Sequence, residues 1–178
     1  MPACNRTSVH DAAAQALQEK KEVALNTTAP PPPDDSIPKS QVMSLADAEK
    51  ILGERAHETE RAAEIKDDTS FYRCTYMADI IDTKTGKTGA IYFMIEKYRN
   101  ELAAQKNYSS IKAANENHGI KVLDKLGDEA YFHSDRKNFY FILVRKGKKM
   151  FRIKVNKITS HTSLDEFNSF AGKLTEKL

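Results

Sequence analysis

The distribution of proline divides this chain into two parts. The segment 27–40, TTAPPPPDDSIPKS, holds five of the six prolines. Consecutive prolines fix φ and lack a backbone donor, so they favour an extended polyproline II conformation and exclude helix and sheet. A segment of this kind acts as a semi-rigid spacer. We therefore expect a disordered N-terminal tail over residues 1–40 and a single folded domain over residues 41–178.

The composition is that of a soluble globular protein. Of the 178 residues, 40% are hydrophobic and 30% are charged, which allows an adequate core and a highly charged surface. The 28 basic and 25 acidic residues nearly balance and leave a net charge of only +3. Since nucleic-acid-binding domains are strongly basic, we expect no nucleic-acid partner. No apolar run reaches the roughly 18 residues of a membrane-spanning helix. The two cysteines, Cys4 and Cys74, are too far apart and too few for a disulfide framework.

Cys4 follows a short motif that indicates lipid attachment. The stretch MPAC has the form of the last four residues of a bacterial lipobox, in which the cysteine is acylated and becomes the mature N-terminus. Pro2 is an unusual residue for the middle of that motif. The basic and apolar segments that precede a lipobox are missing, so we expect an earlier start codon or a trimmed sequence. The alternative is an incidental cysteine in the flexible end of a cytosolic protein. The polar spacer that follows favours the lipid anchor, and Asn5 favours the outer membrane.

From residue 42 onward the sequence predicts regular elements. Ser44 and Asp47 form a capping pattern at the start of a helix that ends near Gly53. The predicted elements are a helix over 44–53, a short helix and loop over 54–70, strands over 70–81 and 90–98, a helix over 100–117, a short strand and a longer one within 119–134, a hairpin over 138–158 and a helix over 163–178. Tight turns make the strands antiparallel. The fold class is therefore α+β, a two-layer antiparallel sheet of about five to six strands with helices on one face.

Two predicted strands are apolar at both odd and even positions. FYFILV at 139–144 and AIYFMI at 90–95 need cover on both faces of the sheet. Helices on one face leave the other face as a surface for a partner protein, a groove for an apolar ligand, or a face covered by the 54–70 segment. For the helix over 100–117, the inward candidates are Leu102, Ala103, Ile111 and Ala114.

The hairpin 136–157 concentrates positive charge. Its candidate anion-binding residues are Arg145, Lys146, Lys148, Lys149, Arg152 and Lys154. Such a cluster predicts a polyanion-binding module that recognises phosphate groups, anionic lipid headgroups or nucleic acid. Lysines on an exposed edge strand give the same pattern for another reason, because they prevent edge-to-edge aggregation.

Catalytic motifs are missing from the sequence. The histidines have no metal-ligand spacing to each other or to cysteine, and the glycines form neither a GxGxxG motif nor a P-loop. Cys74, among aromatic residues on a strand, is expected to be a small buried hydrophobe without a neighbouring base. We therefore predict no enzymatic activity, no metal and no cofactor.

The body of the chain resembles a loose class of bacterial proteins. The matching residues are Leu52, Gly53, Cys74, Tyr76, Leu126, Gly127, Asp128, Glu129 and Ala130. They are similar to residues of small extracytoplasmic lipoproteins of unknown function and of the external sensor domain of a mycobacterial kinase. The resemblance implies an exported, non-enzymatic binding domain over about 42–178. Combined with Cys4, it predicts a lipid-anchored binding or structural domain on the periplasmic side of a bacterial cell envelope, with the polyanion-binding module as the alternative.

Overall fold

The computed structural model describes residues 37–178, except for the side chain of His118. These residues belong to one compact unit, Ser36–Leu178, which includes residues 36–40 of the segment that the sequence analysis assigns to the tether. The elements are η1 (Lys39–Gln41), α2 (Leu45–Leu52), β1 (Ala56–Lys66), β2 (Thr69–Ala78), β3 (Ala90–Lys97), α3 (Glu101–Asn115), η2 (Glu116–His118), β4 (Lys121–Val122), β5 (Glu129–Ser134), β6 (Phe139–Lys146), β7 (Lys149–Asn156) and α4 (Leu164–Glu176).

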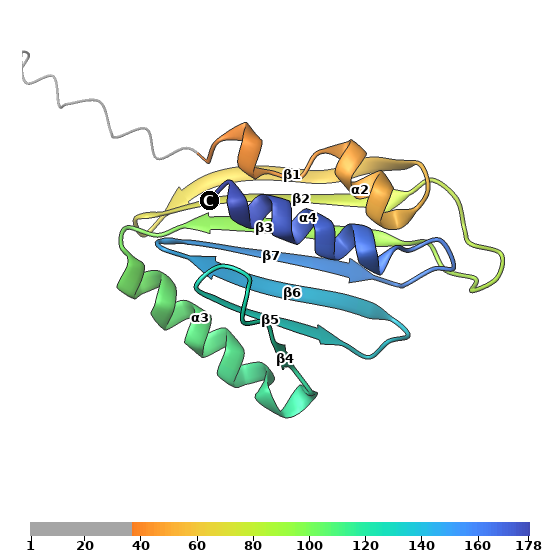
Figure 1. Cartoon of the computed structure of the whole chain (residues 1–178). Helices are drawn as coiled ribbons and strands as arrows, with labels where there is room; N and C mark the ends of the chain where they lie inside the picture. The colour runs from red at the N-terminus through yellow and green to blue at the C-terminus, as the bar shows by residue number, and fades with distance from the viewer. Residues whose placement is uncertain (1–36) are drawn as a thin grey trace, which may run out of the picture. The chain divides into compact units, whose positions relative to one another are not determined.

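The strands form one antiparallel sheet in the order β1-β2-β3-β7-β6-β5-β4. The last strand in the sequence, β7, lies between β3 and β6 and so joins the two hairpins (Figure 1). The α+β class is therefore confirmed, but the sheet has seven strands in the described chain rather than five or six. The additional strand is β1 at one edge, while the short strand predicted within 119–134 is the two-residue β4 at the other edge.

Strand β1 replaces the helix and loop predicted for residues 54–70. Its sequence, AHETERAAEIK, is exposed almost throughout and lacks the apolar alternation of a half-buried strand. Backbone pairing with β2 from Ala56↔Ala78 to Lys66↔Thr69 holds it in place, interrupted by a bulge between Glu58 and Glu60. Charged side chains along its length protect this edge from pairing with another chain.

Helices α2 and α4 cover one face of the sheet, as predicted (Figure 1). Ser44 caps α2 with the expected capping box, and Ser163 accepts a hydrogen bond from the backbone N–H of Glu166 at the start of α4. The core between these helices and the sheet contains large side chains with no solvent exposure, including Phe93, Phe151 and Phe167. Burial stabilises each of them by about 1.5–3 kcal/mol.

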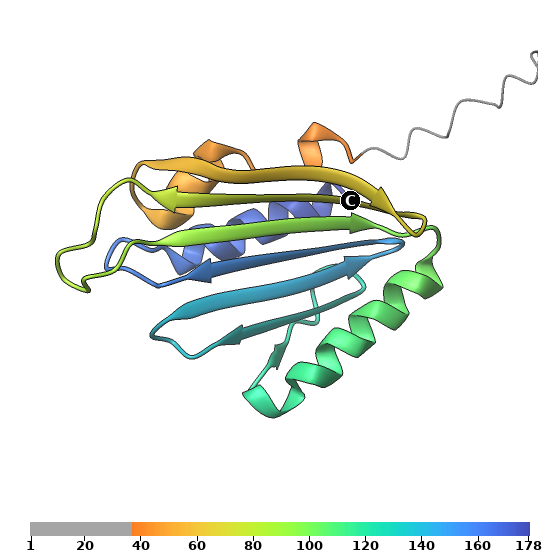
Figure 2. The same ribbon diagram turned by 180° about the vertical axis from the view of Figure 1, so that it is seen from behind.

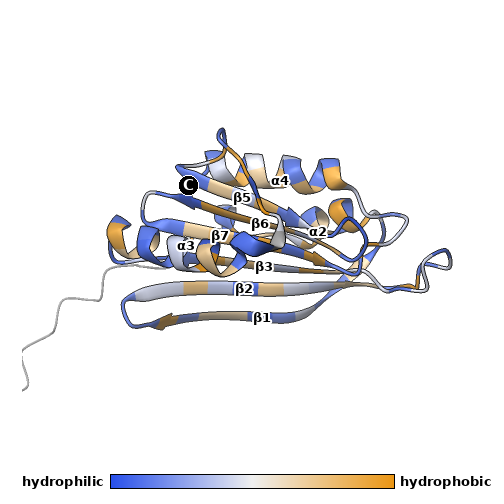
Figure 3. Ribbon diagram, turned by 90° about the horizontal axis from the view of Figure 1, so that it is seen from below, coloured by the Kyte–Doolittle hydropathy of each residue, from blue (hydrophilic) through white to orange (hydrophobic). Residues whose placement is uncertain are grey.

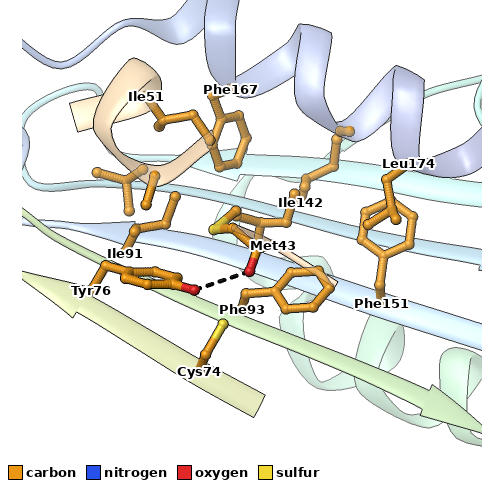
Figure 4. Packing of buried hydrophobic residues seen from close by; sticks show 14 of the residues in the cluster. Met43, Ile51, Cys74, Tyr76, Ile91, Phe93, Ile142, Phe151, Phe167 and Leu174 are labelled. Carbon is orange, nitrogen blue, oxygen red and sulfur yellow. Dashed lines mark hydrogen bonds between the residues drawn. The ribbon is translucent and has the colours of Figure 1, made fainter. Parts of the chain in front are cut away.

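One buried hydrogen bond joins this core to the segment before α2. The hydroxyl of Tyr76 donates to the backbone carbonyl of Met43 over 3.0 Å, as the dashed line in Figure 4 shows. Cys74 is two residues before Tyr76 on β2, so its side chain points to the same face of the sheet, and it is fully buried (Figure 4).

Helix α3 lies on the opposite face, so the prediction of helices on one face only is wrong. Figure 2 shows α3 in front of the sheet on the side that α2 and α4 leave bare. Its buried residues are Ala104 and Tyr108, which pack with Tyr131, Leu143 and Met150. Of the four inward candidates, Ala103 and Ile111 are partly buried against this cluster, whereas Leu102 is 73% exposed and Ala114 is exposed. The buried side of the helix is centred on Tyr108, whose aromatic ring buries more apolar surface than Leu102 would.

No helix within residues 37–178 is both long enough and apolar enough to cross a membrane.

Candidate functional site

Helix α3 covers only part of its face of the sheet. In Figure 2 no helix lies in front of β1, β2 and β3. The pairing register defines which side chains share this face: His133, Phe141, Lys154, Tyr92 and Thr75 lie in one row across five strands. This row, which runs from β5 to the uncovered strands β3 and β2, therefore mixes aromatic, cationic and polar side chains and differs from the hydrophobic core on the other face.

A cavity of about 340 Å³ opens where the end of α3 lies over the sheet. We call it the α3 pocket. Its lining residues are Ile111 and Asn115 from α3, His133 from β5, Phe139 and Phe141 from β6, and Arg152 and Lys154 from β7. Figure 3, seen from below, shows that α3 and the neighbouring strands contain both apolar and polar residues along their length. The volume is that of a small-molecule site.

Strand alternation explains how these side chains converge. Phe139 and Phe141 are two residues apart on β6 and therefore point to the same face, as do Arg152 and Lys154 on β7. The pairs Phe141↔Lys154 and His133↔Phe141 place the aromatic rings next to a cation and an imidazole. The last turn of α3 supplies the remaining wall through Ile111 and Asn115.

The guanidinium of Arg152 is held from one side. Its Nη2 donates to Oε2 of Glu96 over 2.8 Å, and the Glu96 side chain is almost completely buried. Its Nε is buried and has no hydrogen-bond partner within the described residues. The hydroxyl of Tyr131 is buried without a partner as well, and burial raises its pKa while the positive charge of Arg152 acts in the opposite direction. Both atoms are buried behind the pocket wall, and leaving buried polar groups without partners is costly.

The ammonium of Lys154 lies over an aromatic ring. Its Nζ is 5.6 Å from the centroid of Phe139, within the range of a cation–π interaction. The ring of His133 meets the same phenyl group edge-on at 4.9 Å. On the other side of the pocket, Phe141 contacts Tyr131 with ring centroids 5.8 Å apart. Packed neighbours therefore hold both phenyl rings in defined positions.

The six predicted anion-binding residues do not form one surface. Lys146 and Lys149 point to the face of α4 and η1, where they donate to the carbonyl of Thr175 and to the side chain of Gln41. Arg145 is 5% exposed and lies on the opposite face. Lys148 is exposed in the turn between β6 and β7. Of the six, the structure brings only Arg152 and Lys154 together in one pocket.

Arg145 is surrounded by carboxylates. It lies 2.6 Å from Glu129, 3.1 Å from Asp128 and 3.2 Å from Glu101, and it also donates to the carbonyl of Gly147. These hydrogen bonds hold the start of α3 and the turn before β5 against the hairpin. Its geometry is that of a structural ion pair with three partners.

A second cavity lies on the other face of the sheet, with a volume of about 480 Å³. Six of its eight lining residues come from the continuous segment 121–126, which begins with β4, and the others are Ile142 and Asn168. Although it is larger and has charged residues in its lining, it has no aromatic side chain there, whereas the α3 pocket combines cations with aromatic rings from neighbouring strands.

Other reactive groups within the described chain are isolated. Cys74 is buried, and burial raises its pKa to about 11, so the thiol stays protonated at neutral pH. Residues 37–178 contain no group of three His, Cys, Asp or Glu side chains that could hold a metal ion. Cys4, the predicted lipid-attachment residue, lies outside the described residues.

Arg152 and Lys154 are predicted from the sequence as anion-binding residues, whereas the other residues of the α3 pocket are not. A signal was present, since Phe139 and Phe141 alternate with the same period as Arg152 and Lys154 in the facing strand. Comparison with known proteins adds nothing to this, because no family model, no curated protein and no solved structure matches the chain.

Proposed function

We propose that this protein is a lipid-anchored binding domain of the bacterial cell envelope, exposed on the periplasmic side, which holds a small ligand in the α3 pocket without transforming it. Cys4 is the attachment residue and the proline-rich segment 27–40 is the spacer. The resemblance of residues such as Leu52, Gly53 and Cys74 to extracytoplasmic lipoproteins supports the location.

The observation that carries the binding function is the composition of the α3 pocket. Two cations and two phenyl rings converge in one cavity on a sheet face that α3 covers only in part. Side chains on strands of a sheet are held more rigidly than side chains on loops, which suits a preformed site.

The same pocket gives the reason for proposing no catalysis. Its seven lining residues include no carboxylate, thiol or hydroxyl group. A hydroxyl or thiol nucleophile, or a pair of acid–base carboxylates, would have to come from elsewhere.

The anchor is tested by expressing the gene from its native locus with its upstream DNA. Mass spectrometry of the mature protein should find an acylated Cys4 at the N-terminus. A Cys4→Ser variant should move from the membrane fraction to the soluble fraction, while a Ser8→Ala control stays with the membrane. An unmodified chain that begins at Met1 would contradict the proposal.

The binding function is tested separately by amide chemical shifts of the full chain. The probes are naphthalene and indole compounds that carry a carboxylate, an amide or a hydroxyl group. We expect at least one of them to shift the amide signals of Ile111, Phe139 and Phe141. An Ile111→Trp variant fills the pocket and should abolish these shifts, whereas an exposed Leu102→Trp control on the same helix should retain them. A panel without any shift at these amides would exclude the pocket as the binding site.

A further inference from the structure

The charges around the α3 pocket leave one positive group uncompensated. Arg152 is matched by the carboxylate of Glu96, at 2.8 Å. Lys154 has no ion pair with any carboxylate of residues 37–178; its ammonium lies over the ring of Phe139 instead. Of the arginine and the lysine in the pocket, one is therefore matched by a carboxylate and the other is not, and a single negative charge on a ligand would neutralise the second.

Other cations on the same sheet face are already matched by carboxylates. Arg73 lies 3.0 Å from Glu60 and 4.0 Å from Glu64. Arg145 has three carboxylate partners. A polyanion lying across this face would meet these carboxylates as well as Lys154, and like charges would repel it. The charge distribution therefore favours a ligand with one anionic group over an extended polyanion.

The shape of the pocket indicates a flat ligand body. The phenyl rings of Phe139 and Phe141 lie on one strand face, and Ile111 closes the pocket from α3. Ring-to-ring contacts contribute about 0.5–1.5 kcal/mol beyond the apolar area that they bury. The cavity of about 340 Å³ is large enough for a body of one or two rings.

The two cations of the pocket indicate which anionic group would bind. The side chain of Arg152 is 25% exposed and lines the pocket, while its Nη2 is bonded to Glu96. A guanidinium donates charge-assisted hydrogen bonds to carboxylates, so the N–H groups of Arg152 that are exposed to the pocket suit a carboxylate oxygen. The ammonium of Lys154 is two residues further along the same strand face and supplies the second charge.

We infer that the α3 pocket binds a planar monoanion of the aromatic carboxylate class, with its carboxylate between Arg152 and Lys154 and its ring against Phe139 and Phe141. This inference rests on the proposed binding function and specifies its ligand. The carboxylate and the ring act together, because each alone uses only half of the pocket.

The test compares two probes of equal shape, 2-naphthoate and its neutral counterpart 2-naphthamide, each titrated into the full chain and followed by amide chemical shifts. We expect the carboxylate to bind at least about tenfold more tightly, which corresponds to about 1.4 kcal/mol. Lys154→Met should remove this preference and leave the affinity for the amide unchanged. Lys154→Gln is a second variant in case the methionine disturbs folding.

Lys148→Met is the matched control, since it removes one positive charge from the exposed turn of the same hairpin without touching the pocket. It should leave both affinities unchanged. An equal loss of naphthoate affinity in Lys148→Met would overturn the inference, because the attraction would then be non-specific. If both probes shift the pocket amides with equal affinity, the anion specificity fails but the binding function stands. If neither naphthalene probe shifts the pocket amides but a hydroxyl compound of the wider panel shifts them, the carboxylate assignment fails and the binding function stands. If no compound of that panel shifts the pocket amides, the binding function fails as well.

Discussion

Arg152 and Glu96 face each other across the central strands β7 and β3, with the guanidinium Nη2 2.8 Å from the carboxylate Oε2. Glu96 is 3% exposed, so its negative charge is little screened by solvent. The pair therefore sets both the position of the arginine and the electric potential of the α3 pocket.

Replacing Glu96 by Gln should change ligand affinity and stability in opposite directions. Without the opposing carboxylate, the pocket gains net positive charge, and we expect 2-naphthoate to bind about 3–10-fold more tightly. The loss of a charge-assisted hydrogen bond should lower the free energy of unfolding by about 1–3 kcal/mol. Titrations at low and high salt and urea unfolding measure the two effects. An unchanged naphthoate affinity would show that Glu96 does not tune the pocket.

The orientation of α3 can be tested with two truncations on the same helix. Tyr108 is 2% exposed and packs against the ring of Tyr131, so Tyr108→Ala should cost about 3–5 kcal/mol of stability. Leu102→Ala should change stability by less than about 0.5 kcal/mol because the side chain is in solvent. Urea denaturation of both variants checks this, and similar losses would mean that α3 packs in the orientation expected from the sequence.

Arg145 is expected to stabilise the fold and to play no part in ligand binding. Arg145→Ala leaves Glu129, Asp128 and Glu101 without their shared partner, but solvent reaches all three carboxylates, so we expect a loss of about 1–3 kcal/mol. Lys148→Ala, in the exposed turn nearby, should have almost no effect. Thermal unfolding distinguishes them. A stable Arg145→Ala variant with reduced naphthoate affinity would instead assign Arg145 to the binding site.

Two glycine-to-alanine substitutions should have opposite effects. Gly53 ends α2 with a φ of +74°, and a Cβ there would collide with the backbone carbonyl of His161. We expect Gly53→Ala to destabilise the protein by more than about 1 kcal/mol. Gly172 lies inside α4, where an added Cβ meets no atom within 4 Å. Gly172→Ala should therefore stabilise by about 0.5–1 kcal/mol. Urea midpoints give the sign of each change.

The thiol of Cys74 should be unreactive in the folded protein. It is fully buried, and its pKa is raised to about 11, so almost no thiolate forms at pH 8. In a Cys4→Ser background, a thiol reagent should label Cys74 only after urea unfolds the chain. Rapid labelling without urea would place this strand in a more open environment than the structure shows.

The elements with a clear apolar period were predictable from the sequence. Helices α2 and α4 have capping serines and apolar stripes, and β2, β3, β6 and β7 consist largely of aromatic and β-branched residues. Strand β1 was not predictable, since long-range pairing with β2 rather than its own pattern holds it in the sheet. The face chosen by α3 was missed for a similar reason. Its hydrophobic residues form a weak stripe, and the apolar side of β5 and β6 decides which of them is buried.

For the pocket, the sequence indicated positive charge on the hairpin but not its distribution. Residues of a strand alternate between faces, so the six cations of the hairpin divide into three on the α3 face, two on the α4 face and Lys148 in the turn. Which of them meets a carboxylate depends on distant residues such as Glu96 and Glu129, which sequence spacing does not reveal.

The position of β7 has a consequence for how the chain matures. Before residues 149–156 are synthesised, β3 lacks its β7 neighbour on one side, and β6 lacks it on the other. Both strands then have an unpaired, strongly apolar edge. A chain that leaves the ribosome or a translocation pore N-terminus first must therefore delay closure until nearly all of it has emerged. A chaperone that binds these edges would keep the chain soluble until β7 completes the sheet. Chains truncated before Lys149 should aggregate because both edges stay unpaired.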